Sequence, residues 1–389
     1  MGSGKSSAAI NLMNEDRDNN YIYITPYLKE VERIKKSCIT TKFYEPKFRS
    51  INGEMLTKFD SLHSLLLNQK NIASTHALFK RANEETRELI RNEQYILILD
   101  EVMDVIEQLP IKKGDIDILF GNGLIYENDG FIYWDESKKD YDSRYNDIRD
   151  MALNRNLIYH KDTILIWTFP ADIFEAFKEV YILTYMFDGQ IQKYYYDLNK
   201  IEYDFLSTCY VEGKHSFTEK EGIKHPLCYG NKINVYEGSL NSIGDKEYSL
   251  SNNWYQKRKE SIIGLKNNLK NYFGHKTKAK SHEIMWTTFN DYSKKVKGKG
   301  YTKGFVPCTA RATNEYKDKY VLAYTVNRYV NPIISGFFLD KGIAINEDKY
   351  ALSEMIQWIW RSAIRDDNDI QIYIPSSRMR NLLKDWLNT

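Results

Sequence analysis

Residues 2–6 read Gly-Ser-Gly-Lys-Ser, which matches the second half of a phosphate-binding loop. Glycines allow backbone N–H groups to turn toward a polyphosphate, Lys5 can reach its β and γ oxygens, and the hydroxyl of Ser6 can coordinate magnesium. A chance match in a flexible terminus is the alternative interpretation of so short a stretch. The predicted nucleotide-binding residues are Gly2, Ser3, Gly4, Lys5, Ser6 and Ser7.

A buried strand followed by two carboxylates supports the same prediction. Residues 95–99 (YILIL) form a continuous apolar run, as expected of a strand buried on both faces, and Asp100 and Glu101 follow it directly. We expect Asp100 to hold Mg²⁺ through its water shell and Glu101 to orient or deprotonate the attacking water. A solvated acidic turn is the alternative for the pair alone. Together with the loop at residues 2–6, the pair predicts a P-loop NTPase that uses ATP and Mg²⁺.

Apolar runs of strand length alternate with helical patterns, which predicts an α/β fold with parallel sheets. The predicted strands are Tyr21–Thr25, Ile72–Thr75, Tyr95–Leu99, Thr163–Thr168, Val180–Thr184, Ile284–Thr287, Gly304–Val306 and Ile370–Ile374. The predicted helices are one that Pro26 opens and the segments Thr57–Leu67, Leu78–Arg91, Leu352–Arg365 and Met379–Leu387.

Two parts of this pattern are incomplete. A phosphate-binding loop normally follows a buried strand, and that strand would lie before Met1, so the first sheet apparently lacks its first strand. Either the native polypeptide starts further upstream, which we favour, or a strand from elsewhere fills the gap. Residues 199–280 are polar and Tyr-rich with turn signals at several glycines, which predicts an irregular insertion.

Composition limits the class of protein. A length of 389 residues is enough for two domains, and a charged fraction of 28% is typical of a globular chain. The formal net charge of +2 gives no global sign of a nucleic-acid partner. Four scattered cysteines without a Cys-x-x-Cys pair argue against a disulfide framework and a zinc site. No run is long enough to span a membrane and no signal peptide is visible, which predicts a cytoplasmic protein without a membrane partner.

Three polar residues near the C-terminus form the third candidate element. Gln357, Arg361 and Arg365 are spaced four residues apart within the predicted helix Leu352–Arg365, so we expect them on one helix face. Two arginines on one stripe could reach across a cleft to a γ-phosphate, as arginine fingers do. A solvated or salt-bridging face is the alternative, and for this helix alone it is the commoner one. Because the chain also has the sequence of a P-loop protein, we favour the catalytic interpretation of these residues.

In this order the motifs resemble those of the superfamily 2 (DExx-box) helicases and of helicase-like phage replication proteins. Lys5 and Ser6 match motif I, residues 100–103 (DEVM) match motif II, and residues 357–365 (QWIWRSAIR) resemble motif VI. Residues 168–170 (TFP) stand where motif III usually has Ser/Thr-Ala-Thr. The resemblance implies nucleic-acid contacts at Thr25, Pro26, Thr75, His76, Thr287, Arg311, Thr313 and Asn314.

The match departs from the family pattern at two motifs. Motif III lacks its usual sequence, so its coupling role is open. In motif VI, Trp360 replaces a glycine and Arg365 lies one residue further along than is usual. Either Arg361 or Arg365 could therefore be the finger, and we favour Arg365.

The resemblance implies two RecA-like P-loop domains, residues 1–190 with motifs I–III and residues 191–389 with motifs IV–VI and the insertion. It implies an ATP-dependent helicase or translocase in phage DNA replication or recombination, in the bacterial host cytoplasm. Its partners would be single-stranded or forked DNA, or RNA, and other replication proteins. Lysine-rich runs at residues 266–280 and 294–303 could contact phosphates, although such runs are more often solvated faces. The alternative is a P-loop ATPase without unwinding activity, such as a DNA-packaging motor or a nucleotide-driven assembly switch.

Overall fold

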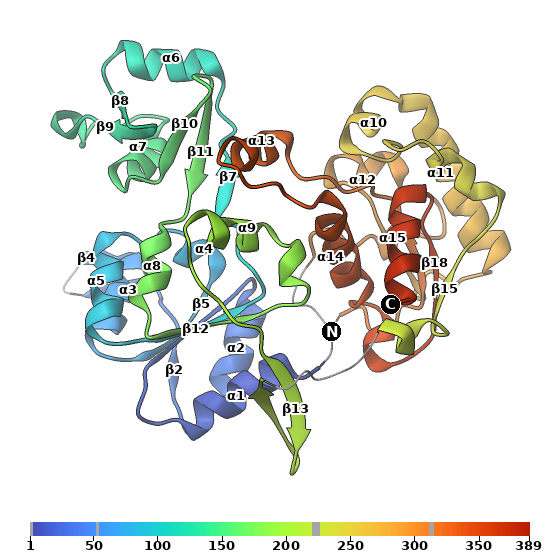
Figure 1. Ribbon diagram of the computed structural model, residues 1–389, viewed down its shortest axis with the longest axis horizontal. Helices are drawn as coiled ribbons and strands as arrows, with labels where there is room; N and C mark the ends of the chain where they lie inside the picture. The colour runs from blue at the N-terminus through green and yellow to red at the C-terminus, as the bar shows by residue number, and fades with distance from the viewer. Residues whose placement is uncertain (1–2, 52–53, 220–225, 311–314) are drawn as a thin grey trace.

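A five-stranded parallel sheet forms the centre of the first half of the chain in this computed structural model, which describes residues 3–51, 54–219, 226–310 and 315–389 (Figure 1). In spatial order its strands are β12 (Glu179–Leu183), β6 (Ile96–Asp100), β1 (Tyr21–Thr25), β5 (Asn71–Thr75) and β2 (Phe43–Tyr44). The central strands β1 and β6 are buried along their whole length, as their apolar sequences predict.

Helices cover both faces of this sheet because successive side chains of a strand point to opposite sides. Tyr21 and Tyr23 pack with one pair of helices, and Ile22 and Ile24 pack with the helices of the other face. The pair on the first face is α1 (Lys5–Glu15) and α2 (Leu28–Ser37). The other helices of this half are α3 (Lys58–Leu67), α4 (His76–Phe79), α5 (Glu84–Asn92), α8 (Ala171–Ala176) and α9 (Ile191–Leu198). A short hairpin of β3 (Arg49–Ile51) and β4 (Glu54–Leu56) lies between β2 and α3 in the sequence.

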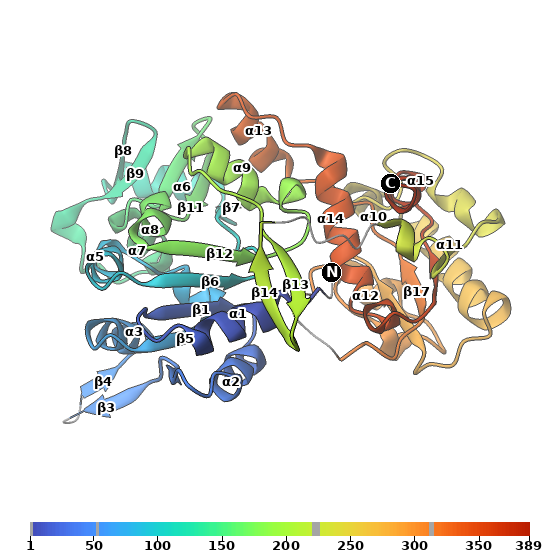
Figure 2. The same cartoon turned by 60° about the horizontal axis from the view of Figure 1, so that its bottom comes forward.

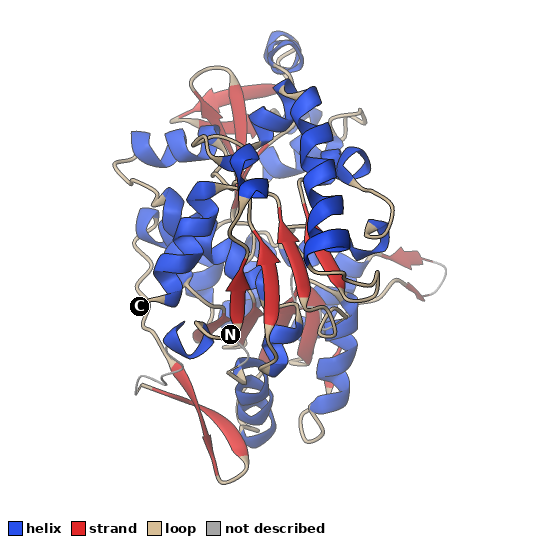
Figure 3. Cartoon of the chain, turned by 90° about the vertical axis from the view of Figure 1, so that its right-hand side faces the viewer, coloured by secondary structure: helices blue, strands red, loops and turns tan. Residues whose placement is uncertain are grey.

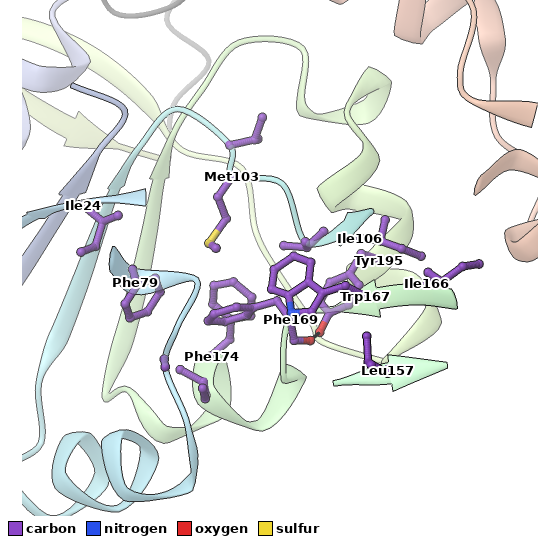
Figure 4. Close-up of a cluster of buried hydrophobic side chains, with 14 of the residues drawn as sticks. Ile24, Phe79, Met103, Ile106, Leu157, Ile166, Trp167, Phe169, Phe174 and Tyr195 are labelled. Carbon is purple, nitrogen blue, oxygen red and sulfur yellow. Dashed lines mark hydrogen bonds between the residues drawn. The ribbon is translucent and has the colours of Figure 1, made fainter. Parts of the chain in front are cut away.

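A second sheet, fully antiparallel, is inserted between β6 and β12. Its spatial order is β7 (Ile106–Gln108), β11 (Ile164–Thr168), β10 (Leu157–His160), β9 (Phe131–Trp134) and β8 (Ile125–Asn128), with helices α6 (Lys113–Gly121) and α7 (Asn146–Leu153). Trp167, Phe169 and Phe174 continue the core of the first sheet into this region (Figure 4). The strand predicted at residues 163–168 therefore exists, but it belongs to this insertion and not to a parallel sheet.

The second half contains a parallel sheet of four strands with helices on both faces (Figure 3). In spatial order the strands are β15 (Ile233–Val235), β18 (Ile370–Tyr373), β17 (Val321–Tyr324) and β16 (Ile284–Thr287). One face packs against α10 (Asn252–Lys257), α11 (Lys259–Asn271) and α12 (Asn290–Val296), and the other against α14 (Glu347–Ile359) and α15 (Ser377–Leu387). Parallel sheets in a mixed α/β chain, as predicted, are confirmed.

Two further elements connect these regions. Helix α13 (Pro332–Asp340), from the second half, packs against the antiparallel sheet, where Asn331 donates to the side chain of Gln108 at 3.0 Å and Lys161 pairs with Asp340 at 2.9 Å. The hairpin of β13 (Ser207–Val211) and β14 (Lys214–Thr218) lies beside α1, as Figure 2 shows. The domain boundary after residue 190 stays a prediction.

Four predicted elements are wrong in detail. Residues 304–306 form no strand, since a 3₁₀ turn ends at Gly304 and only Phe305 makes an isolated bridge; the neighbour of β16 in the sheet is β17, which was not predicted. Residues 78–91 divide between α4 and α5, because Asn83 caps the second helix. Residues 199–280 hold the hairpin, β15, α10 and α11 and are not irregular throughout. The helix predicted to reach residue 365 ends at Ile359.

No helix in the described part of the chain has the combination of length and apolar character needed to cross a membrane.

Candidate nucleotide-binding site

The phosphate-binding loop turns into helix α1 at Gly4. This residue caps the helix with φ of 80° and ψ of 16°, the left-handed region in which a side chain is strained. The imidazole of His215, on β14, packs against it so closely that a Cβ on Gly4 would lie 2.3 Å from Nδ1. Glycine is therefore required here twice over, by backbone conformation and by space. The first turn of the 11-residue helix α1 points its free N–H groups toward the same place.

The carboxylate pair lies at the end of β6, next to the loop. Ser6 donates from Oγ to Oδ1 of Asp100 at 3.4 Å. Burial and the neighbouring charge of Glu101 raise the pKa of Asp100 to about 6, although Arg33 counteracts them in part. Glu101 is also buried, and its φ of 69° places it in the left-handed region. A residue held in that conformation directly after a buried strand indicates a constrained position.

Lys5 lies among these acids. Its ammonium is 3.4 Å from Oγ of Ser3. Burial lowers the pKa of Lys5, and the charges of Glu101 and Asp100 offset part of that shift. A half-buried cation between the phosphate-binding loop and two carboxylates is an incompletely compensated charge, which an anionic ligand would complete.

The second half of the chain contributes an arginine to the same place. Helix α14 ends at Ile359, so Arg361 lies in a turn, where its Nη2 donates to Oε1 of Glu101 at 3.1 Å across 260 residues of sequence. Arg361 is 3% exposed, and within the described residues its Nε has no hydrogen-bond partner. Arg365 lies in the 3₁₀ turn of residues 363–366. The spacing of four residues predicted that both arginines share one α-helical face with Gln357. This prediction is wrong, because the helix ends before either arginine.

Gln357 occupies a different environment. It lies on α14 and is 2% exposed, and neither its Oε1 nor its Nε2 has a partner among the described residues. It does not line the cavity that the other candidate residues share.

A cavity of about 360 Å³ brings most of the predicted residues together. Its lining combines the phosphate-binding loop, the two carboxylates at the end of β6 and two arginines from the second half. The lining residues from the predicted set are Ser3, Gly4, Lys5, Ser6, Ser7, Asp100, Glu101, Arg361 and Arg365. Gly2 lies outside the described residues.

These groups suit a nucleotide phosphate with magnesium. The helix N-terminus, Lys5 and the free Nε of Arg361 are donors for phosphate oxygens. Ser6 and Asp100 are oxygen ligands of the kind that Mg²⁺ takes, with phosphate and water supplying the rest. No group of three or more His, Cys, Asp or Glu side chains in the described ranges is placed to hold a metal ion.

Sequence patterns missed other residues of this cavity. Thr184 follows β12 and lines the cavity with a buried hydroxyl that has no partner among the described atoms. Because Leu183 pairs with Asp100, Thr184 lies at the strand end next to the carboxylates. The sequence did contain a signal for Thr184, because it is the last residue of the predicted strand Val180–Thr184 and ligands bind at the carboxyl ends of parallel strands. Glu30, Arg33, Tyr185 and His215 also line the cavity without an earlier assignment.

Thr168, the residue matched to motif III, does not lie there. It ends β11 in the antiparallel sheet and lines a separate cavity of about 500 Å³. Its strand pairs with β7 and β10 and not with β6. Thr184, and not Thr168, lies at the strand end beside Asp100.

The predicted nucleic-acid contacts lie at strand ends. Thr25, Thr75 and Thr287 end β1, β5 and β16, and Pro26 and His76 directly follow two of these strands. Thr25 and Thr287 have no exposed surface, so neither side chain reaches a bound strand in this conformation. Three further predicted residues lie outside the described part of the chain: Arg311, Thr313 and Asn314. All the predicted nucleic-acid contacts therefore stay predictions.

Comparison with known proteins finds two family models and a close relative. The "YonV middle domain" matches residues 106–167, which form the antiparallel sheet, and the "YonV C-terminal Rossmann-like domain" matches residues 228–387. The "SPbeta prophage-derived uncharacterized protein YonV" of Bacillus subtilis (strain 168) is 51% identical over 398 residues, covering 100% of this chain and 97% of that protein.

Two solved structures align over almost the whole chain. "XPD_Helicase" gives a TM-score of 0.48 at 10% identity and covers 100% of this chain and 94% of its own. "Structure of S. tokodaii Xpd4" gives a TM-score of 0.48 at 12% identity, covering 99% and 92%. Likeness at this level carries no conclusion about activity.

Proposed function

This chain belongs to the YonV family, and we propose that it is an ATP-hydrolysing P-loop motor acting on nucleic acid, a helicase or single-strand translocase. The observation that carries the proposal is the cavity that both halves of the chain share. Glu101 from the first half and Arg361 from the second half meet there at 3.1 Å. A nucleotide bound between two halves can couple hydrolysis to their relative movement.

Each residue of the cavity has a role in this proposal. The N–H groups of α1 and the ammonium of Lys5 hold the β- and γ-phosphates. Ser6 and Asp100 hold Mg²⁺, which neutralises phosphate charge during hydrolysis. Glu101 orients the attacking water and accepts its proton.

The arginines respond to the nucleotide. In the structure Arg361 is paired with Glu101. With ATP bound, the guanidinium of Arg361 or Arg365 turns to the γ-phosphate and stabilises the charge that develops there. Release of Arg361 would at the same time free Glu101 to bind water, so one event prepares both groups. Thr184, with its free hydroxyl beside Asp100, positions the water or the γ-phosphate.

In this proposal the two parallel sheets form two RecA-like domains, and nucleic acid binds near the carboxyl ends of their strands. The partner is single-stranded or forked DNA or RNA, in the cytoplasm of a bacterial host. Sequence resemblance to the superfamily 2 helicases and the prophage origin of the B. subtilis relative support this part.

Steady-state ATPase activity with and without single-stranded DNA tests the proposal. We expect hydrolysis that DNA or RNA stimulates severalfold and that Lys5→Ala abolishes. Hydrolysis that ignores both nucleic acids would replace the motor with the second candidate, a nucleotide-driven assembly ATPase. Absence of Lys5-dependent hydrolysis under all conditions would contradict both.

A further inference from the structure

A second cavity, of about 500 Å³, lies where three parts of the chain meet. Its walls come from α5, α8 and α9 of the first half, from β9 and β10 of the antiparallel sheet, and from α13 of the second half. Residues 168–170, the segment matched to motif III, also line it. It shares no lining residue with the nucleotide cavity, so it is a separate site.

Positive charge exceeds negative charge on the walls of this cavity. Arg87, Arg155 and Lys341 line it, together with the acids Glu84 and Asp172. Arg87 pairs with both acids, and its Nη2 lies 2.9 Å from Oε1 of Glu84. Arg155 and Lys341 are exposed, and neither forms an ion pair with an acid in the described part of the chain. Two cations without a counter-charge favour an anionic ligand.

Two buried polar groups on the same walls lack partners. Asn156 is 4% exposed, and no hydrogen bond joins its side-chain amide to another described residue. The Nε of Arg87 is also buried without a partner among the described atoms. A side-chain amide both donates and accepts, so Asn156 can bond the edge of a nucleobase. Unused groups of this kind inside a cavity indicate that a polar ligand satisfies them.

Aromatic rings complete the lining. Phe131 on β9 and Phe337 on α13 both face the cavity, and Phe131 is 38% exposed although it is a large apolar residue. Cations beside an exposed ring suit a single strand, whose phosphates pair with the cations while an unpaired base stacks on the ring. An acidic peptide would leave the ring and the amide unused. The volume is that of a small-ligand pocket, which accommodates an unpaired base and excludes a duplex.

We propose that this cavity binds single-stranded nucleic acid. Arg155 and Lys341 contact its phosphates, one unpaired base stacks on Phe131, and the amide of Asn156 bonds the edge of that base. The inference rests on the proposed function and deepens it, because it gives the motor a specific contact with its strand. A strand held there touches the first half, the antiparallel sheet and α13 together.

Fluorescence anisotropy with a labelled oligothymidine of about 12 nucleotides, without ATP, tests the site. The double variant Arg155→Asn and Lys341→Gln removes both charges. Asparagine also suits the left-handed backbone of residue 155, whose φ is 57°, so the fold should be retained. We expect affinity to fall at least about tenfold. The slope of log Kd against log salt should fall by about 1.4, because each phosphate contact on a single strand contributes about 0.7.

The matched control is the double variant Lys266→Gln and Lys270→Gln. It removes two exposed charges from α11, in the lysine-rich run at residues 266–280, and should leave the slope unchanged. Phe131→Ala tests the base contact separately. It should weaken oligothymidine at least about fivefold and leave the affinity for an abasic strand of equal length unchanged.

The contrary outcomes are distinct. Equal losses in the cavity variant and the α11 variant would show that only overall charge matters, which overturns the site. Normal affinity of the cavity variant would overturn the site and leave the proposed motor standing. If the unsubstituted chain binds neither single-stranded DNA nor RNA, both the site and the nucleic-acid part of the proposed function fail. Displacement of the DNA by poly-glutamate at equal charge concentration would assign the cavity to an acidic peptide and overturn the proposal.

Discussion

Glu101 combines three properties that are costly in an ordinary residue. It is a buried acid, its backbone is left-handed, and its partner Arg361 comes from the other half of the chain. A left-handed residue with a side chain costs about 1–2 kcal/mol, and a buried ion pair seldom returns its desolvation cost. Such costs persist where surrounding structure imposes them, and they collect at functional sites. The conformation therefore favours a catalytic role for Glu101 over a solvated acidic turn.

Lys5→Ala should abolish ATP hydrolysis without unfolding the chain. Lys5 makes no ion pair in the described structure and its burial already lowers its pKa, so its loss removes a phosphate ligand and little stability. Turnover by phosphate release and far-ultraviolet circular dichroism measure the two effects. Lys113→Ala, at an exposed position of helix α6, is the matched control and should leave turnover unchanged. Normal hydrolysis by Lys5→Ala would contradict the site.

Replacing either arginine should lower ATP turnover to a similar extent, but only one of the two replacements should lower the stability of the fold. Arg365→Ala should lower kcat about 10³-fold, as loss of an arginine finger does, with little change in the free energy of unfolding. Arg361→Ala should lower kcat as much and also cost about 3–5 kcal/mol, because Glu101 would stay buried without its partner. Urea unfolding and ATP turnover separate these effects. If both variants hydrolyse ATP normally, the assignment of residues 357–365 to motif VI is wrong.

Asp100 should make stability depend on pH. Its pKa rises from 3.8 in the unfolded chain to about 6 in the folded one, so the folded state holds the proton more tightly. This contribution is fully present below pH 3.8 and is lost as the pH rises through 6, in total about 3 kcal/mol. We expect Asp100→Asn, which cannot ionise, to gain about that much stability relative to the unsubstituted chain between pH 4 and pH 7. Urea unfolding without magnesium at both pH values measures the difference, and an equal difference at both would contradict the shift.

At the scale of elements, long apolar strands were predictable and the ends of elements were not. Residues 21–25, 95–99 and 370–374 are β-rich runs with clear limits, and the structure places strands there. β17 (Val321–Tyr324) has only four residues, and Gly304–Val306 looked equally apolar. Which of these two segments becomes a strand depends on hydrogen bonds to neighbouring strands, and the sequence alone does not show these bonds.

Helix α11 shows the opposite failure. Ile262, Leu265 and Leu269 repeat at helical spacing and pack into one core, but surrounding glycines and polar residues obscured the pattern. The early end of α14 has no glycine or proline signal at all. It follows from long-range contact, since the N–H of Ala363 bonds to the carbonyl of Lys319 at 2.9 Å and draws the backbone away from the helix. The position of Arg361 in the site depends on this turn, and sequence spacing alone misplaced it.

Helix α14 should therefore support both the fold and the site. Trp358 is fully buried, packs on Tyr324 with ring centroids 5.4 Å apart, and donates from Nε1 to the carbonyl of Val306 at 3.2 Å. Trp358→Ala should cost about 3–5 kcal/mol in urea unfolding, and ATP turnover should fall because the turn with Arg361 follows directly. Ile263→Ala, at an exposed position of α11, should change stability by less than about 0.5 kcal/mol. A stable and fully active Trp358→Ala would show that α14 does not position Arg361.

At the scale of the whole molecule, two of the contacts between the halves bear on the site. Arg361 and Glu101 join them at the cavity, and α13 joins the second half to the antiparallel sheet through Phe337, Phe338 and Asp340. A buried apolar contact at α13 is the more persistent of the two, whereas the ion pair can exchange one partner for a phosphate. Movement between the halves is therefore expected to open and close the cavity while α13 stays packed.

Binding of a non-hydrolysable ATP analogue should accordingly protect two distant segments together. Amide exchange should slow in the first turn of α1 and in residues 360–366, because phosphate contacts order both sides of the cavity at once. In the double variant Arg361→Ala and Arg365→Ala, protection should remain in α1 and disappear from residues 360–366, while α13 should be unaffected in either protein. This pattern is specific to closure, since a ligand that bound only to the phosphate-binding loop would protect α1 in both proteins and the second segment in neither. Protection of residues 360–366 that persists without the arginines would mean that the halves close through other contacts, and the coupling between the nucleotide and the second half would then have to be sought elsewhere.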